Sequence, residues 1–302
     1  MNKEEEFEEV ILGNSIEFSP LIVGCMKLGE WGAKFDESSM HGFVEGCLEL
    51  GFHTFDHADI YGGYTTEAQF GKVLKADPSL RENMQLISKC GIRLVSSNRP
   101  SHGIKSYDLS AEHIRESVEQ SLQNLQTDYL DVLLLHRPDY LMNPYEVASV
   151  FEELQEEGKV LHFGVSNFKP SQVDLLLPFV DVVANQVQAS VFHLDPFEDG
   201  TLDHCNLNGV QPMAWSPMAG GRYFDPQNEQ ARRVQKVVQQ LCAKYDCTED
   251  QLLLAWLLAH PSYIIPVLGT TKLERIESAS GAFGLILERE DWYAVFQAST
   301  GQ

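Results

Sequence analysis

Eight short, apolar and β-rich segments alternate with helix-like segments along almost the whole of this 302-residue chain. They are LIVGCM, FHTFDHA, MQLISKC, LDVLLLHR, HFGVSN, VVANQVQ, QPMAWSP and YIIPVLGTT. Strands that alternate with helices form a parallel sheet, and eight of them suffice to close that sheet into a barrel. The pattern therefore predicts an α/β fold, a single (β/α)8 TIM barrel, as one domain over residues 1–302.

The ends of several expected helices are marked by their residue types. Ser110 precedes a helical spacing of Ile114, Val118 and Leu122, which predicts a helix over 110–126 with Ser110 as its N-cap. The segments 36–51 and 143–159 show similar start and stop signals. Before the barrel, VILGNSIEFSPLIVG predicts a β-hairpin that turns at Gly13 and Asn14, after an acidic lead-in over residues 1–10.

The chain carries 44 acidic residues against 22 basic ones, which argues against nucleic acid or an anionic membrane as a partner. No apolar run has the length of a membrane span, and the first residues lack the pattern of a signal peptide, so a cytoplasmic protein is expected. The six cysteines form no CxxC pair, which predicts reduced thiols and neither a zinc nor a redox role for them.

Most of the expected strands end in residues that can form hydrogen bonds or ionise. Any one such residue has an ordinary explanation as the polar end of a strand, but seven strands ending this way predict a polar mouth above an apolar barrel. In a (β/α)8 barrel this C-terminal rim is where the chemistry takes place. The residues are Asp56, Lys89, His136, Ser166, Asn167, Gln186, Ser216, Thr270 and Thr271.

The segment FDHADIYGG (55–63) contains the densest group of these side chains. Alternation along a strand places Asp56 on one face and His57 on the other, so the two should not bind one metal ion. His53 and His57 are expected to pack between strand and helix. Tyr61 follows in a glycine-containing loop that can return its phenol to the mouth near Lys89 and His136.

A tyrosine beside a lysine can act as an acid at an oxygen atom. At an effective dielectric near 20, the coupling to Lys89 is at most about 4 kcal/mol, which would lower the phenol pKa by roughly three units. Asp56 would keep Lys89 charged, and His136 would orient a carbonyl or share in the proton transfer. Such a group supplies no reducing equivalents, so a cofactor must bring them.

The usual dinucleotide fingerprint is missing, since no G-x-G tripeptide occurs. Two late segments instead predict an anion site, because phosphate sites of barrels form in the last two loops. WSPMAGGRYF offers small residues and backbone amides, and GTTKLERI places Thr270, Thr271, Lys272 and Arg275 at a helix start.

From about Leu21 to Glu288 the sequence resembles the aldo-keto reductases, and a bacterial branch in particular. The motifs that carry the resemblance are GFHTFDHADIYGG, LISKC, LDVLLLHRPD, GKVLHFGVSNF, NQVQ, MAWSP and VLGTTKLERI, in the family's order. The resemblance implies a catalytic tetrad of Asp56, Tyr61, Lys89 and His136, with Tyr61 as general acid. It also implies NADPH (or NADP+) as cofactor, and a small aldehyde or ketone as the substrate.

The resemblance further implies the residues that would bind the cofactor. Ser166, Asn167 and Gln186 would hold the nicotinamide carboxamide, Trp215 would stack on the ring, and the 2'-phosphate would lie at the helix start of GTTKLERI. The full set is Gly24, Met26, Asp56, Ser166, Asn167, Gln186, Trp215, Ser216, Pro217, Met218, Gly221, Thr270, Thr271, Lys272 and Arg275. Cys25, Ser278 and Ala279 depart from the family's pattern.

The resemblance implies that the long C-terminal loop of many relatives is reduced here. The substrate pocket is therefore expected to use Met26, Trp31, Ile60, Arg137 and the long segment after Cys90. Two other functions stay open: an NADPH-binding sensor or regulatory protein with little turnover, and an aldolase that forms a Schiff base on Lys89. The substrate and the oligomeric state are not decided by the sequence.

Overall fold

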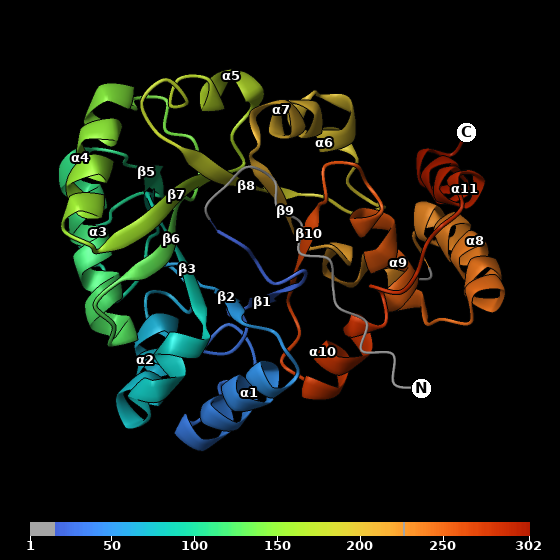
Figure 1. Ribbon diagram of the computed structural model, residues 1–302, viewed down its shortest axis with the longest axis horizontal. Helices are drawn as coiled ribbons and strands as arrows, with labels where there is room; N and C mark the ends of the chain where they lie inside the picture. The colour runs from blue at the N-terminus through green and yellow to red at the C-terminus, as the bar shows by residue number, and fades with distance from the viewer. Residues whose placement is uncertain (1–15, 226) are drawn as a thin grey trace.

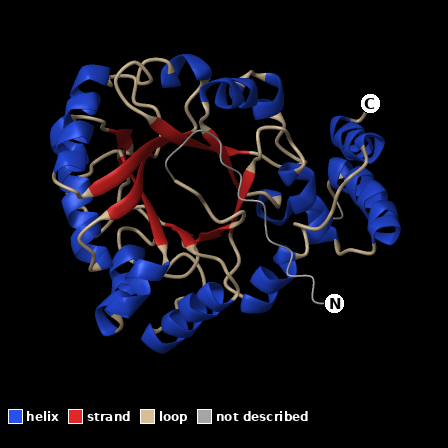
Figure 2. Ribbon diagram, viewed as in Figure 1, coloured by secondary structure: helices blue, strands red, loops and turns tan. Residues whose placement is uncertain are grey.

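The computed structural model describes residues 16–225 and 227–302, and its centre is a closed barrel of eight parallel strands. The order around the barrel is β1-β10-β9-β8-β7-β6-β3-β2. Figure 2 shows the ring of strands with helices around it. The strands are β1 (Ile22–Gly24), β2 (Thr54–Asp56), β3 (Gln85–Cys90), β6 (Leu130–Leu135), β7 (Val160–Ser166), β8 (Val182–Gln188), β9 (Gln211–Trp215) and β10 (Ile265–Leu268). The (β/α)8 barrel predicted from the sequence is confirmed.

The helices follow the strands along the chain and cover the outside of the barrel (Figure 1). They are α1 (Glu37–Glu49), α2 (Thr66–Ala76), α3 (Ala111–Leu125), α4 (Pro144–Glu156), α5 (Pro170–Val173), α6 (Asp195–Glu198), α7 (Thr201–Asn208), α8 (Glu229–Tyr245), α9 (Glu249–Leu258), α10 (Leu273–Ser280) and α11 (Arg289–Thr300). Two 3-10 helices are η1 (Pro78–Asn83) and η2 (Ala219–Phe224). The last helix, α11, lies beside α8 at one side of the molecule (Figure 1).

The helix-start signals in the sequence correspond to real caps. Asp36 accepts a hydrogen bond from Ser39 N at 2.8 Å, and Ser110 accepts one from His113 N at 3.3 Å. Pro144 opens α4, and Gly158 beyond its end has a φ of 70°, a conformation that glycine adopts without strain. The predicted hairpin at Gly13 and Asn14 and the lead-in over residues 1–10 lie outside the described residues.

Strand β6 shows how the sequence fills both sides of the barrel wall. Val132 and Leu134 belong to the core inside the barrel, whereas Leu133 and Leu135 belong to the core between strands and helices. Side chains of a strand alternate between its faces, so an apolar run in a buried parallel sheet packs on both sides. These apolar side chains fill the barrel interior below its C-terminal rim, so the polar residues at the strand ends lie directly above an apolar core.

The long segment after Cys90 forms a small antiparallel sheet of its own. Strand β4 (Ile92–Arg93) pairs with β5 (Ser106–Tyr107), and the residues between them form the loop that the sequence predicted. The hydroxyl of Tyr64 accepts a hydrogen bond of 2.8 Å from Leu94 N, which fastens this segment to the loop after β2. None of the described helices is long and apolar enough to span a membrane.

Candidate active site

Four residues from separate elements meet at one rim of the barrel. Asp56 ends β2, Lys89 lies at the end of β3, and His136 follows β6 directly. The loop after β2 returns Tyr61 to this group, so that its ring lies 6.1 Å from that of His136, edge to face. The structure thus brings together the four residues that the sequence marked as a tetrad.

Lys89 lies at the centre of the group and is fully buried. Its Nζ lies 2.7 Å from Asp56 Oδ1 and donates hydrogen bonds to the backbone oxygen of His57 at 2.7 Å and to Tyr61 OH at 3.1 Å. An ammonium group has three protons, and these three contacts use all of them. The contacts therefore require the charged form of the lysine.

Electrostatics favour the same form of Lys89. Burial alone would lower the pKa of the ammonium group, but Asp56 and Tyr61 raise it, and the net result is a pKa above the ordinary value. A Schiff-base lysine needs a lowered pKa and a free lone pair. The geometry therefore argues against the aldolase alternative.

The sequence predicted that Lys89 lowers the pKa of the Tyr61 phenol. For the protein without cofactor, this prediction is wrong. Burial raises the pKa of the phenol to about 12, and this exceeds the lowering by Lys89, while Asp56 adds a further raise. The sequence argument counted the lysine but not the loss of water around the ring. Tyr61 accepts from Lys89, and no described residue accepts a hydrogen bond from its hydroxyl.

His136 is neutral at this site. Burial lowers its pKa well below the ordinary value, and the positive charges of Lys89, Arg137 and Lys105 lower it further. Its backbone N–H donates to Cys90 O at 2.9 Å, which fixes the residue against the end of β3. The Nδ1 atom is buried and has no hydrogen-bond partner in the described structure.

A chain of side-chain hydrogen bonds links the ends of β7, β8 and β9 to the tetrad. Gln186 Nε2 donates to Asp56 Oδ1 at 2.8 Å, and Ser166 Oγ donates to the backbone oxygen of Gln186 at 2.8 Å. Asn167 Nδ2 donates to Ser166 Oγ at 2.7 Å, and Trp215 Nε1 donates to Asn167 Oδ1 at 2.9 Å. The contact of Gln186 with Asp56 was not expected, and no local sequence signal points to it.

The two loops expected to hold phosphates are a turn with two glycines and the start of a helix. Gly220 and Gly221 have φ values of 63° and 93°, and a Cβ atom built on either would meet nothing within 4 Å. Ser216, Pro217 and Met218 connect them to β9. After β10, Thr270 and Thr271 lead into α10, where Lys272 and Arg275 are exposed. Free backbone amides of helix starts and glycine turns are common phosphate ligands.

Gly24 has a structural reason to be a glycine. A Cβ at this position would lie 2.7 Å from Leu268 O, so a larger residue would push β1 away from β10. Cys25, which follows it, is buried, and its thiol points to Val23 O. Contact of Gly24 with a cofactor stays a prediction.

Three of the residues expected to form the substrate pocket, Trp31, Ile60 and Arg137, lie beside Tyr61 or Trp215. Trp31 lies 6.3 Å from the Tyr61 ring, and Arg137 lies over the indole of Trp215 with its Cζ 5.5 Å from the centroid. Met26 is exposed, and Ile60 is buried in a small cluster with Tyr61. Trp31 is therefore part of the mouth and not a remote surface residue.

The two histidines near Asp56 differ from each other. His57 packs edge-on against Phe70 of α2, with ring centroids 4.4 Å apart, as expected. His53 is exposed, and its Nδ1 lies 3.0 Å from Asn83 O, so the expectation that it packs between strand and helix is wrong. The difference arises because β2 begins only at Thr54, which leaves His53 in the preceding turn.

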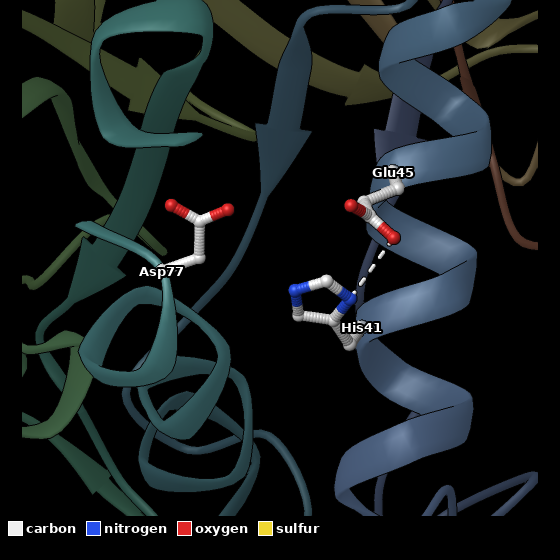
Figure 3. Close-up of side chains that lie close together, drawn as sticks. All are labelled: His41, Glu45 and Asp77. Atoms are coloured by element: carbon white, nitrogen blue, oxygen red, sulfur yellow. Dashed lines mark ion pairs between the residues drawn. The ribbon is translucent and has the colours of Figure 1, made fainter. Parts of the chain in front are cut away.

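One group of potential metal ligands lies away from this site, on the outer helices (Figure 3). His41 Nδ1 and Glu45 Oε2 of α1 are 3.0 Å apart, and Asp77 faces them from the end of α2, with the ligand atoms all within 4.8 Å of one another. Asp77 also accepts hydrogen bonds from Ser79. None of these residues contacts the tetrad in the described structure. That no metal takes part in the chemistry stays a prediction.

Comparison with known proteins agrees with the geometry of the rim. The model of the Aldo/keto reductase family matches residues 20–299. The chain is 42% identical to the uncharacterized oxidoreductase YcsN of Bacillus subtilis, covering 97% of this chain and 98% of that protein. It is 43% identical to the oxidoreductase YdhF of Escherichia coli, over 94% of this chain and 95% of that one.

Two further relatives add a named activity and a solved fold. The chain is 36% identical to a 6-dehydroglucose reductase of Agrobacterium fabrum, over 98% of this chain and 99% of that protein. The crystal structure of the thermostable aldo-keto reductase Tm1743 with the inhibitor epalrestat matches with a TM-score of 0.80 at 26% identity, covering 96% and 98% of the two chains. By sequence match and by fold alike, the chain belongs to the aldo-keto reductase family of oxidoreductases.

Proposed function

We propose that this protein reduces an aldehyde or ketone to an alcohol with NADPH, and that Tyr61 is the proton donor. The observation that carries the proposal is the use of all three Lys89 protons on Asp56, His57 O and Tyr61 OH. Because Tyr61 accepts from Lys89, its own proton points away from the lysine and is available to a substrate oxygen. The proposal is also supported by the name of the 36% identical relative, a reductase.

Each residue of the tetrad has a separate role in the proton transfer. As negative charge grows on the carbonyl oxygen, Tyr61 donates its proton and becomes a phenolate. The ammonium of Lys89, 3.1 Å away, stabilises that phenolate, and Asp56 holds the ammonium in place. His136 is neutral, so it directs the carbonyl by hydrogen bonding and does not add a positive charge.

The cofactor site proposed here extends from the tetrad to α10. NADPH, when bound, supplies the hydride. Ser166, Asn167 and Gln186 would hold its carboxamide, with Trp215 against the nicotinamide ring. Ser216, Pro217, Met218 and Gly221 would line the pyrophosphate, and the open space at the two left-handed glycines supports this. Thr270, Thr271, Lys272 and Arg275 would bind the 2'-phosphate; Gly24 and Met26 complete the site.

We also propose a cytoplasmic setting for the reaction. The six cysteines of the chain are free thiols, which is the usual state in a reducing compartment.

The test of this function uses purified protein and two readouts. NADPH is added while protein fluorescence is followed, and the loss of nicotinamide absorbance is then followed with 4-nitrobenzaldehyde. We expect binding and turnover. Tyr61→Phe should keep NADPH affinity and lose most of the rate, and near-normal turnover in this variant would show that another group donates the proton.

A second candidate is a slow NADPH-binding sensor or regulatory protein, which the high pKa of Tyr61 favours. A general acid works best when its pKa is near the operating pH, and a pKa of about 12 is far above it. NADPH binding without turnover of any activated aldehyde would support this candidate over the reductase.

A further inference from the structure

Arg137 reaches across the mouth of the barrel. It follows His136 at the end of β6, yet its guanidinium lies over the indole of Trp215 at the end of β9. In the barrel, β7 and β8 stand between these two strands. Neighbouring strands are about 4.8 Å apart, so the two residues can meet only if both side chains lean over the opening. The guanidinium therefore lies above the site where a substrate must enter.

The positive charge of Arg137 has no acidic partner among the residues that the structure describes. The chain has twice as many acidic as basic residues, and the buried Arg81 and the partly buried Arg93 each lie beside an acid. Arg81 lies 2.7 Å from Asp131, and Arg93 lies 3.0 Å from Asp108. Arg137 is half-buried and makes neither an ion pair nor a hydrogen bond with any described residue. Partial burial lowers its pKa, because the cation has lost part of its surrounding water.

A second cation, Lys105, lies on the segment between β4 and β5. Lys105 is exposed on this segment, and its charge, like that of Arg137, acts on His136. Asp56 is already engaged with Lys89, and it is the only carboxylate of the tetrad. Arg137 and Lys105 thus add positive charge near His136 in a protein whose formal net charge is −22.

We propose that Arg137, assisted by Lys105, binds an anionic group, a carboxylate or a phosphate, at the end of the substrate remote from the reacting carbonyl. This inference rests on the proposed function and names its substrate class: a small carbonyl compound with a negative charge. A guanidinium binds both oxygens of such a group through two parallel hydrogen bonds, which fixes direction as well as position. The contact with Trp215 holds the guanidinium at the mouth, and no described residue accepts a hydrogen bond from its N–H groups.

The test compares two aldehydes that differ by the charge and one methyl group, 4-formylbenzoate and its methyl ester. For the wild type we expect kcat/KM to be at least about tenfold higher for the acid, a difference of about 1.4 kcal/mol. In Arg137→Met this ratio should fall to one or below, mainly through KM of the acid. Arg137→Lys should keep part of it, since the charge remains but the paired hydrogen bonds are lost. Arg289→Met, on the exposed start of α11, is the matched control and should keep the wild-type ratio.

A second pair of substrates separates the two sources of negative charge. Glyceraldehyde 3-phosphate is compared with glyceraldehyde, in the wild type and in Lys105→Met. For each pair we compare kcat/KM of the charged compound with that of the uncharged one. If this ratio is larger for the phosphate pair and falls in Lys105→Met, the site binds phosphates. If it is larger for the benzoate pair, the site binds carboxylates.

Three outcomes would overturn the inference. The wild type could reduce acid and ester equally well, Arg137→Met could retain the ratio, or Arg137→Met could weaken NADPH binding as much as it weakens use of the acid, which would place Arg137 in the cofactor site. If no aldehyde is turned over, the proposed function fails, and binding of acid and ester to the NADPH-loaded protein is measured by tryptophan fluorescence. Tighter binding of the acid then still supports the anion site, and equal binding rejects it.

Discussion

The side-chain amide of Gln186 donates a hydrogen bond of 2.8 Å to Oδ1 of Asp56, a residue 130 positions earlier in the chain. The same carboxylate oxygen lies 2.7 Å from Lys89 Nζ. Gln186 therefore holds the carboxylate that holds the lysine, in addition to its proposed contact with the nicotinamide carboxamide. Asp56 is nearly fully buried, so it depends on such partners in place of water.

Replacing Gln186 should therefore lower the rate as well as cofactor affinity. In Gln186→Met we expect kcat to fall about tenfold. This corresponds to about 1.4 kcal/mol, close to what one hydrogen bond to a charged group contributes. Steady-state kinetics and NADPH titration give the two effects separately. Gln188→Met, two residues further along β8, should match the wild type. If NADPH binding weakened while kcat stayed unchanged, Gln186 would serve the cofactor alone.

The alkaline side of the pH–rate profile tests the state of Tyr61. The phenol must be protonated to donate, and its pKa of about 12 keeps it protonated throughout the neutral and mildly alkaline range. We expect kcat/KM for carbonyl reduction to show no decline from this group between about pH 6 and pH 10. His136 is neutral over this range because its pKa is well below the ordinary value. A descending limb centred near pH 8 would contradict the assignment, provided that circular dichroism shows the fold intact.

The choice between NADPH and NADH should depend on Lys272 and Arg275. Both are exposed at the start of α10, and Lys272 has only a distant ion pair with Glu274, at 3.8 Å. In the double alanine variant we expect KM for NADPH to rise by about tenfold or more, while KM for NADH changes by less than about threefold. Lys236→Ala, at an exposed position of α8, is the control. Equal losses for both cofactors would show that the pair does not touch the 2'-phosphate.

The buried His57 should make the fold sensitive to acid. Burial lowers its pKa from 6.5 to about 3, with a smaller contribution from Lys89, and neither ring nitrogen has a partner in the described structure. Between these two pH values His57 is protonated in the unfolded chain but neutral in the folded protein. The free energy of unfolding therefore falls as the pH falls. The loss is about 1.4 kcal/mol per pH unit, or about 2 kcal/mol by pH 5.

Urea unfolding at pH 7 and pH 5 measures this effect. His57→Leu should reduce the drop in the free energy of unfolding by about 2 kcal/mol relative to the wild type. His53→Leu, at the exposed neighbouring histidine, should leave the drop unchanged. An undiminished drop in His57→Leu would mean that His57 is protonated in the folded protein.

Several parts of the fold and the site were readable from local sequence. Alternation in β2 placed Asp56 inward and His57 toward α2, and the structure confirms both. The sequence also predicted that a short loop containing Gly62 and Gly63 brings Tyr61 back to the mouth. Both glycines have positive φ values. Such features depend on residues a few positions apart, for which spacing and backbone preference are sufficient.

Other parts depended on segments that are distant in the chain. Glu67 is an example: it is fully buried and accepts hydrogen bonds from Ser88 at 2.6 Å and Ser121 at 3.2 Å, and no local pattern distinguishes it from a surface acid at a helix start. The stacking of Arg137 on Trp215 likewise requires that the ends of β6 and β9 face one another. Neither contact follows from spacing along the chain.

The sequence by itself determined the barrel, the order of its strands along the chain and the residue types at its rim, because periodicity and strand-end chemistry are local properties. Only the tertiary structure decided how those residues act on one another. Closure of the barrel removed water from Tyr61, which raised its pKa, and placed Asp56 beside Lys89, which raised the lysine pKa although burial alone lowers it. It also brought Gln186 to Asp56 and left Arg137 over the opening without an ion pair among the described residues. Burial and long-range contact set these energies, and both arise only when distant segments pack together.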